Sequence, residues 1–435
     1  MSNLTLSFNL QRQRICRHLE RKMISFDSRR GFLKTSTTLV AGAAASSSIS
    51  FAQQTDGEDF WDMVRNQFSF TEKAVPMNAA NLCPSFRAVS EKVALLTADI
   101  DQDCSFNNRA KFSGLLEQTR SLVAAQLNVS RDEIALVRNT SEANNIINNG
   151  LSLNAGDEII MWDQNHQTNN VAWDVRAQRF GLMIKRVPVP TNPVSEADLI
   201  DAFTSQFTPR TKVLTLTHVS NLSGIKLPMK QIIQAARANG IYVHLDGAQT
   251  WGAMELDLKD LDPDSYSASA HKWYMGPKEV GLLYVKSQNI DKIWPSVIAP
   301  GWGDAALTIL QGARKFESLG QRDDAALAGL GVAAQIHNTI GPARIEARIV
   351  ELSQRLKQGI AAGGHELVTP MDPNLSSGVC ITKAPAGQGG RISNALYTDY
   401  GIACAATGGI RICPTIYNTI DHVDRAIAGV NALLA

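Results

Sequence analysis

An aspartate and a lysine in the middle of the chain have the types and the spacing that cofactor chemistry requires. Asp246 ends a strand-like run and begins the motif Asp-Gly-Ala-Gln, and Lys272 ends the motif Ser-Ala-His-Lys. A carboxylate held against a pyridine nitrogen and an amine able to form a Schiff base are the two protein groups that pyridoxal 5'-phosphate (PLP) needs. The pair therefore predicts a PLP site.

These residues need a scaffold, and the pattern between residues 78 and 305 supplies one. Short apolar runs alternate with amphipathic stretches, as in βαβ units. The expected strands are 133–138, 158–163, 212–217, 241–246 and 281–286, and the expected helices are 141–149, 168–180, 195–206 and 229–239. This alternation predicts an α/β fold with a mostly parallel, doubly wound sheet, in which ligands bind at the carboxyl ends of the strands.

The rest of the chain predicts a smaller α+β domain. Residues up to Gly363 favour helices, and four short strands and a final helix are expected at 365–369, 378–384, 401–405, 409–413 and 421–434. We therefore predict a PLP-binding large domain at 78–305 and a small C-terminal domain at 306–435. Residues 53–77 are expected to pack on the small domain.

The N-terminal segment is typical of an export signal. Arg29-Arg30 precedes Phe-Leu-Lys and a weakly apolar run ending in Ser-Phe-Ala52, which resembles a twin-arginine signal peptide over residues 1–52. Translation starting at Met1 or at Met23 is compatible with this pattern. A disordered basic tail is the alternative. The signal predicts export of the folded protein to the periplasm by the twin-arginine translocase.

Charge and cysteine content narrow the function classes. Removing residues 1–52 takes away eight Lys/Arg and two Asp/Glu, which changes the formal net charge from +1 to about −5. No basic stripe then favours nucleic acid or an anionic membrane, no transmembrane helix is expected, and we predict no metal site. Five cysteines remain, too few for a disulfide framework, although Cys404 could pair with Cys413 in an oxidising compartment.

Four motifs together resemble one enzyme family. They are Asp-Gly-Ala-Gln at 246–249, Ser-Ala-His-Lys at 269–272, His-Val-Ser-Asn at 218–221 and Ile-Tyr-Asn-Thr at 416–419. The chain after residue 75 resembles the class V aminotransferase and cysteine desulfurase group of fold-type I PLP enzymes, particularly its isopenicillin N epimerase-like branch. This resemblance implies a seven-stranded type of sheet and a homodimer with active sites at the interface.

The resemblance also implies roles at the cofactor ring. Lys272 would form the Schiff base and then serve as general base, and Asp246 would keep the pyridine nitrogen protonated. His166 would stack on the ring, Gln249 would reach the phenolic oxygen, and Asn221 would lie beside it. A loop histidine without a role and a plain turn asparagine remain alternatives for His166 and Asn221.

Other residues would hold the phosphate. Thr140 and Ser141 lie between an expected strand and an expected helix, where backbone N–H groups and hydroxyls favour an anion; simple N-capping is the alternative explanation of the same residues. By resemblance, Ser269 and His271 are phosphate ligands. Gln321 stands where relatives carry a threonine that reaches the phosphate of the neighbouring subunit.

Arg411 would bind the substrate carboxylate through its planar guanidinium, which indicates an α-amino acid or a peptide residue with a free carboxylate; a surface ion pair is the alternative. Only six residues separate Cys404 from Arg411, too few for the mobile cysteine loop of a desulfurase, which favours a core role for Cys404. The expected chemistry is of the aminotransferase or epimerase type at Cα. A carbon–sulfur lyase and a noncatalytic cofactor-binding homologue are the alternatives.

Overall fold

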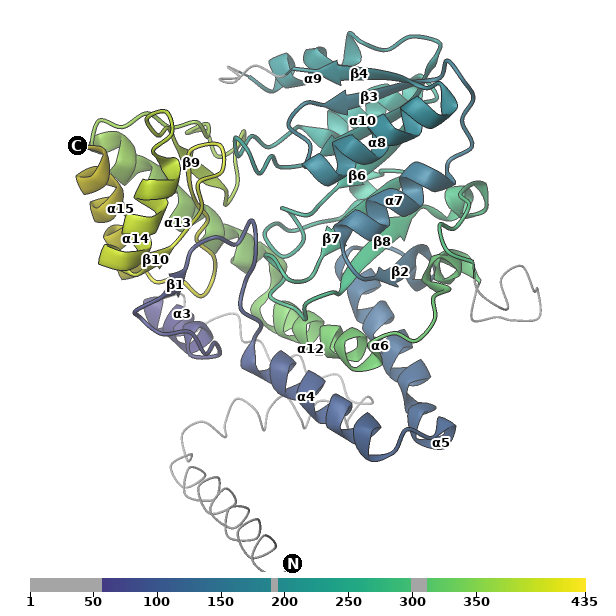
Figure 1. Cartoon of the computed structure of the whole chain (residues 1–435), viewed down its shortest axis with the longest axis horizontal. Helices are drawn as coiled ribbons and strands as arrows, with labels where there is room; N and C mark the ends of the chain where they lie inside the picture. Colours follow the sequence, from purple (N-terminus) through teal and green to yellow (C-terminus); the bar gives the residue numbers. More distant parts are fainter. Residues whose placement is uncertain (1–56, 189–194, 299–310) are drawn as a thin grey trace, which may run out of the picture. The chain divides into compact units, whose positions relative to one another are not determined.

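The computed structural model describes residues 57–188, 195–298 and 311–435. Its main sheet has seven strands in the order β2-β8-β7-β6-β5-β3-β4 (Figure 1). The strands are β2 (Ile134–Val137), β3 (Glu158–Trp162), β4 (Met183–Val187), β5 (Thr211–Thr217), β6 (Tyr242–Asp246), β7 (Ser265–Ser269) and β8 (Gly281–Val285). Only β8 runs antiparallel to its neighbours. The predicted mostly parallel α/β sheet is confirmed.

Alternation along the buried strands explains why helices cover both faces of the sheet. Ile159 and Met161 of β3 belong to one apolar cluster, and Ile160 and Trp162 belong to another. Successive side chains of a strand point to opposite faces, so both faces exclude water. Helices α7 (Thr140–Gly150) and α8 (Gln167–Phe180) supply the first cluster, and α9 (Glu196–Thr204) and α10 (Met229–Ala238) supply the second.

The remaining helices extend the second cluster and build the C-terminal part. They are α3 (Glu58–Arg65), α4 (Arg87–Gln102), α5 (Phe106–Arg109), α6 (Lys111–Gln126), α11 (Leu258–Leu261), α12 (Asp324–Ile340), α13 (Pro342–Ala362), α14 (Gly389–Tyr400) and α15 (Ile420–Leu434), with 3-10 helices η1 (Arg131–Glu133), η2 (Ser287–Lys292) and η4 (Gly312–Glu317). Helix α12 packs on α4 and α6.

Two small sheets lie in the C-terminal part. β9 (Cys380–Thr382) pairs antiparallel with β11 (Ile410–Ile412), and β1 (Val75–Pro76) pairs parallel with β10 (Ile402–Ala403). Val75 and Met77 are fully buried in the cluster that α13, α14 and α15 form with these strands. The N-terminal stretch thus contributes a strand and core side chains here. The domain limits at residues 78 and 305 stay predictions.

The sequence predicted neither the two-residue strand β1 nor β4 and β7 of the main sheet, and it predicted one strand too many. β4 is an exposed sheet-edge strand whose Lys and Arg interrupt the apolar pattern, and β7 consists of small residues, Ser-Tyr-Ser-Ala-Ser, all of them buried. Residues 365–369 pair with β9 only through an isolated bridge between Leu367 and Thr382, because the Ile381 N–H donates to the Thr369 hydroxyl and not to a backbone carbonyl. The other expected strands and helices are confirmed within a few residues.

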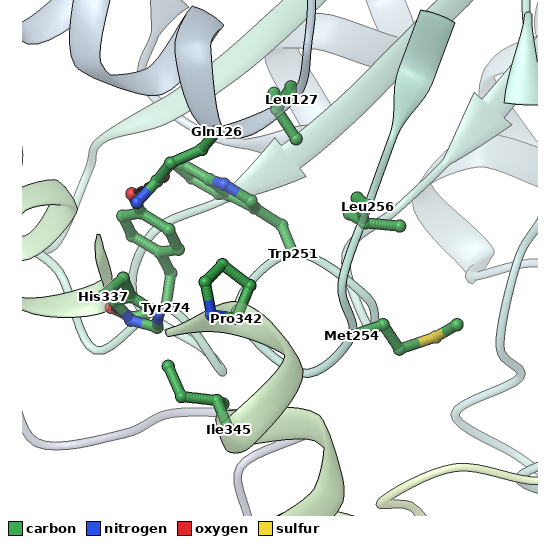
Figure 2. A pocket seen from close by; sticks show the side chains of 10 residues that line it. Gln126, Leu127, Trp251, Met254, Leu256, Tyr274, His337, Pro342 and Ile345 are labelled. Carbon is green, nitrogen blue, oxygen red and sulfur yellow. Dashed lines mark hydrogen bonds between the residues drawn. The ribbon is translucent and has the colours of Figure 1, made fainter. Parts of the chain in front are cut away.

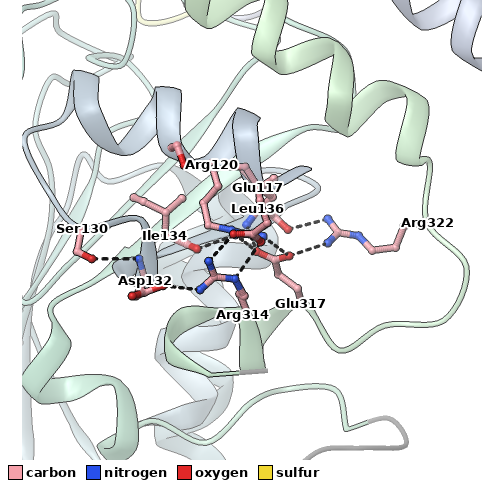
Figure 3. Close-up of polar contacts among 10 residues, drawn as sticks. Glu117, Arg120, Ser130, Asp132, Ile134, Leu136, Arg314, Glu317 and Arg322 are labelled. Atoms are coloured by element: carbon pink, nitrogen blue, oxygen red, sulfur yellow. Dashed lines mark hydrogen bonds and ion pairs between the residues drawn. The ribbon is translucent and has the colours of Figure 1, made fainter. Parts of the chain in front are cut away.

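Side chains cap the outer edge of β2 (Figure 3). Glu317 accepts a hydrogen bond from the backbone N–H of Leu136 at 2.5 Å, and Arg322 donates to the Leu136 carbonyl at 2.6 Å. Arg120, which is 2% exposed, donates to the Ile134 carbonyl at 2.8 Å and forms an ion pair with Glu317. These contacts satisfy backbone groups that would otherwise be open to strand pairing. They also fix the segment that carries Gln321.

The predictions of an export signal and of no transmembrane helix have different outcomes. The signal predicted at residues 1–52 lies outside the described residues. Among the described helices, none is both long enough and apolar enough to cross a membrane.

We predict that Glu317→Ala lowers the free energy of unfolding by about 3 kcal/mol, because Arg120 then keeps a buried charge without its main partner. Urea unfolding measures the loss. The control is Glu366→Ala, which breaks the ion pair with Lys383, where both side chains are more than 60% exposed. That pair is expected to contribute less than about 1 kcal/mol. Equal losses in the two variants would contradict the assignment.

Candidate active site

The carboxyl ends of the parallel strands bring the predicted residues to one edge of the sheet. Asp246 ends β6, Ser269 ends β7, Thr140 follows β2, and His166 follows β3. Lys272 lies three residues beyond β7. The charged groups lie close enough to act on one another. Asp246 raises the pKa of Lys272 and Arg411 lowers it. The charges of Lys272, Asp246 and Arg411 all shift the pKa of His166.

Asp246 is held by two N–H donors. Asn144 Nδ2 donates to Oδ2 at 2.9 Å, and the backbone N–H of Ala248 donates to Oδ1 at 3.0 Å. The side chain is 1% exposed. The next residue, Gly247, has no room for a side chain, because the Tyr266 ring lies 2.0 Å from the position that a Cβ atom would occupy. Burial and fixed donors leave the carboxylate oriented as an acceptor, as a partner for a protonated pyridine nitrogen must be.

Lys272 lies in a tight turn. Its carbonyl accepts from Met275 N at 3.0 Å, and Gly276 N donates to the Ala270 carbonyl at 2.8 Å. Met275 has φ +50° although it is a buried non-glycine residue, a left-handed conformation that persists only where the surroundings impose it. Burial lowers the pKa of Lys272, Asp246 raises it, and Arg411 lowers it. The net lowering favours a neutral, nucleophilic amine.

An aromatic stack fixes the segment after Lys272 (Figure 2). The Tyr274 ring lies between Trp251, with centroids 3.8 Å apart, and His337, with centroids 4.2 Å apart. Tyr274 also donates from its hydroxyl to Gln126, and His337 Nε2 bonds the Tyr274 carbonyl at 2.9 Å. Stacking and hydrogen bonds therefore hold the backbone two residues from the lysine, so the Lys272 side chain starts from a fixed point.

The N-terminus of α7 meets the end of β7. Thr140 N donates to Ser269 Oγ at 2.8 Å, and the two hydroxyl oxygens lie 2.7 Å apart. Ser141 lines a cavity of about 410 Å³ beside this helix end. Burial and the charges of Lys272 and Lys278 lower the pKa of His271 to about 4, so its imidazole is neutral at pH 7. Thr140 N and Glu142 N already have acceptors here, so the hydroxyls and the positive end of the helix are what fit a phosphate.

His166 is the N-cap of α8, and its loop is fixed by asparagines. Asn165 accepts from Thr217 N and donates to the Thr215 carbonyl, both at 2.8 Å. His166 Nδ1 lies 2.8 Å from the Thr168 hydroxyl. Loss of hydration lowers the pKa of His166, Lys272 and Arg411 lower it further, and Asp246 opposes them. The ring is thus neutral at pH 7 and lies close to the charged groups of the site.

Two glutamines have partners that the sequence analysis did not expect. Gln249 donates to the Ala80 carbonyl at 3.0 Å and accepts from Trp273 Nε1 at 2.8 Å. One amide hydrogen is left for a cofactor oxygen. Gln321 is exposed and bonds Arg109 at 2.7 Å and the Arg322 carbonyl at 2.9 Å, so it is not part of the site of its own chain. Its role toward a neighbouring subunit stays a prediction.

Arg411 comes from β11 and reaches the site from the small sheet. It donates to the Asn221 carbonyl at 3.0 Å and to Asn78 Oδ1 at 3.1 Å, and it is 5% exposed. Among the described residues, no carboxylate lies within 4.0 Å of its guanidinium, and its buried Nε has no hydrogen-bond partner. The expected alternative, a surface ion pair, is therefore wrong. A buried cation oriented by neutral acceptors can bind an incoming anion.

The sequence analysis missed the residues that support the site. Asn144 orients Asp246, His244 bonds Asn144, Asn78 orients Arg411, and Trp273 bonds Gln249. Asn144 could have been found, since it stands one helical turn after Thr140 and therefore shares its face of α7.

The residues present fit PLP. A buried carboxylate suits the pyridine nitrogen, a half-buried lysine with a lowered pKa suits the aldehyde, and the Thr140–Ser269 hydroxyls at a helix N-terminus suit the phosphate. No group of three or more metal-ligating side chains occurs in the part of the chain that the structure describes.

Comparison with known proteins agrees with this geometry. The family model for aminotransferase class V matches residues 103–425. Isopenicillin N epimerase of Streptomyces clavuligerus is 26% identical over 390 residues, covering 86% of this chain and 98% of that protein. A cysteine desulfurase of Serratia proteamaculans is 31% identical over 347 residues, covering 73% and 82%. The chain belongs to the aminotransferase class V family, whose members are PLP-dependent enzymes.

Solved structures share the fold. Apo cysteine desulfurase from Thermococcus onnurineus NA1 has a TM-score of 0.77 and 22% identity, covering 88% of this chain and 99% of that one. The cystine C–S lyase C-DES, solved with its product cysteine persulfide, has a TM-score of 0.74 and 23% identity, covering 83% and 97%. The predicted fold-type I architecture is thereby confirmed, and PLP is the cofactor.

We predict that Lys272→Ala abolishes covalent retention of the cofactor. Borohydride treatment followed by mass analysis should add the mass of reduced PLP to the Lys272 peptide of the wild type and to no peptide of the variant. The control is Lys278→Ala, which removes a lysine six residues away that bonds Ser85 instead. A wild-type adduct on any other lysine would overturn the assignment.

Proposed function

We propose that this protein is an exported enzyme that transforms the Cα of an α-amino acid, or of a peptide residue with a free carboxylate, by transamination or epimerisation. The observation that carries the proposal is Arg411, a buried guanidinium with neutral partners only, near Lys272 and Asp246. Bound PLP supplies an electron sink for a carbanion at Cα.

The chain's own residues then divide the work. Arg411 binds both oxygens of the substrate carboxylate, which fixes how Cα faces Lys272. Lys272, once its amine is free, takes the Cα proton, since burial lowers its pKa and so favours the neutral amine that can act as a base. Asp246 holds its negative charge at the pyridine nitrogen. His166 covers one side of the site with a neutral ring that adds no competing charge.

Desulfuration is disfavoured by the state of Cys404. Its thiol is half-buried and lies 3.5 Å from the Ser393 hydroxyl, and burial raises its pKa to about 11. At pH 8 about one thiol in a thousand is then ionised, too few for a nucleophile that must attack sulfur. All five described cysteines are free thiols, so the Cys404–Cys413 bond considered from sequence is not formed.

We predict that Arg411→Leu lowers kcat/KM for the best α-amino acid about 100-fold, mainly through KM, because a two-point carboxylate contact is lost. The screen adds amino acids to the holoenzyme, follows the cofactor absorbance and identifies products by mass and chiral analysis. The control is Arg391→Leu, an exposed arginine of α14. Release of sulfide or pyruvate from sulfur amino acids, with neither a 2-oxo acid that keeps the substrate's whole side chain nor an inverted product, would instead establish a carbon–sulfur lyase.

The N-terminal sequence supports the proposal that the enzyme is exported. The Arg29-Arg30 motif directs proteins to a translocase that carries folded chains, so a cofactor joined to Lys272 can be loaded before transport. The enzyme would then act in the periplasm. We also propose a homodimer in which Gln321 contacts the neighbouring subunit's phosphate, since ion pairs already fix its segment on β2.

We predict that Arg29→Lys with Arg30→Lys leaves most of the protein in the cytoplasm of a bacterium that has this translocase. Cell fractionation with immunodetection measures the distribution. The matched control replaces Arg12 and Arg14 by lysine in the same segment and should export normally. Exported wild-type protein should begin at Gln53, and an unprocessed wild-type chain in the cytoplasm would contradict the export proposal.

A further inference from the structure

Three serines of β7 lie on one face and each contacts a different group. Ser265 Oγ lies 2.8 Å from His244 Nδ1, Ser267 Oγ lies 2.5 Å from Asn144 Oδ1, and Ser269 bonds Thr140. The period of two along the strand aligns the serines. Strand pairing sets His244 opposite Ser265 and Asp246 opposite Ser267, so both β6 side chains lie beside the same serine row.

The chemistry of these groups fixes the direction of every hydrogen bond around Asn144. Asp246 accepts from Asn144 Nδ2 at 2.9 Å, so the amide nitrogen faces the carboxylate. The amide oxygen can then only accept, so His244 Nε2, at 2.9 Å, and the Ser267 hydroxyl must donate to it. His244 therefore carries its proton on Nε2, and its Nδ1 accepts from Ser265.

Burial makes this arrangement hard to change. Asn144, His244, Ser265 and Ser267 are each no more than 1% exposed. Water cannot replace a lost partner, so each donor depends on its one acceptor. Burial also lowers the pKa of His244 to about 3, which keeps the imidazole neutral throughout the range in which such an enzyme works.

We propose that Asn144, held by His244 and Ser267, is a positioning residue that orients Asp246 toward the cofactor ring. The inference rests on the role of Asp246 as the partner of the pyridine nitrogen. Ala248 N binds one carboxylate oxygen and Asn144 binds the other, so the rotation of the carboxylate is set from both sides. Asn144 and Thr140 are one turn apart on α7 and lie on the same face of the helix. That face therefore contacts both Asp246, the residue for the cofactor ring, and the residues for the cofactor phosphate.

The test compares two asparagines of one helix. Asn144→Leu should weaken PLP binding to the apoprotein about tenfold to 100-fold, the effect of losing one hydrogen bond to a charged group. The pH at which the visible band of Lys272-bound PLP titrates should rise by about one unit, since a less firmly protonated ring withdraws fewer electrons. The control is Asn148→Leu, one turn further along, because Asn148 is equally buried but its Nδ2 bonds nothing in the described chain.

A second pair of variants separates positioning from packing. His244→Leu should reproduce the Asn144→Leu changes, and His244→Gln should restore wild-type values at least in part, since the glutamine amide can donate to Asn144. Thermal unfolding of each apoprotein shows whether it folds. Unchanged PLP affinity and titration in folded Asn144→Leu and His244→Leu would overturn the proposal. If the wild-type protein binds no PLP at Lys272, the assignment of the cofactor site itself is wrong.

Discussion

The packing of α7 against β6 and β7 is the contact on which the rest of the site depends. Thr140 at the start of the helix meets Ser269, and Asn144 one turn later meets Asp246 and Ser267. No apolar side chain could make these contacts, so the interface is polar inside an otherwise apolar sheet. Such an interface tolerates one register only, because a shift of one residue would bury several donors without acceptors.

Residues from two separate sheets contribute to the site. The main sheet supplies the carboxylate and the lysine, and the small sheet supplies Arg411 through β11. Asn221 and Asn78 hold the arginine from the two sides, one from the loop after β5 and one from the stretch after β1. Substrate recognition is therefore joined to cofactor chemistry by neutral amide and carbonyl groups, which leave the positive charge of Arg411 available.

The sequence predicted the sheet and most of the cofactor-facing residues because both leave local signals. Apolar runs reveal the strands, and Asp246 and Lys272 lie in short motifs at strand ends. It missed β7 because buried serines have no apolar signature. The hydrogen-bond partners of Ser267 and Ser269 lie in α7, more than 100 residues earlier in the chain. It also missed the two partners of Gln249, since Ala80 and Trp273 come from unrelated parts of the sequence. Long-range polar pairing is what a local pattern cannot show.

The capped edge of β2 has a consequence for how copies of this protein can associate. Glu317 and Arg322 occupy the outward N–H and C=O of Leu136, and Arg120 occupies the carbonyl of Ile134. A strand from another molecule would have to displace a buried ion network before it could pair there. At this edge of the sheet, subunits can then recognise one another through side-chain surfaces and not through backbone pairing along β2.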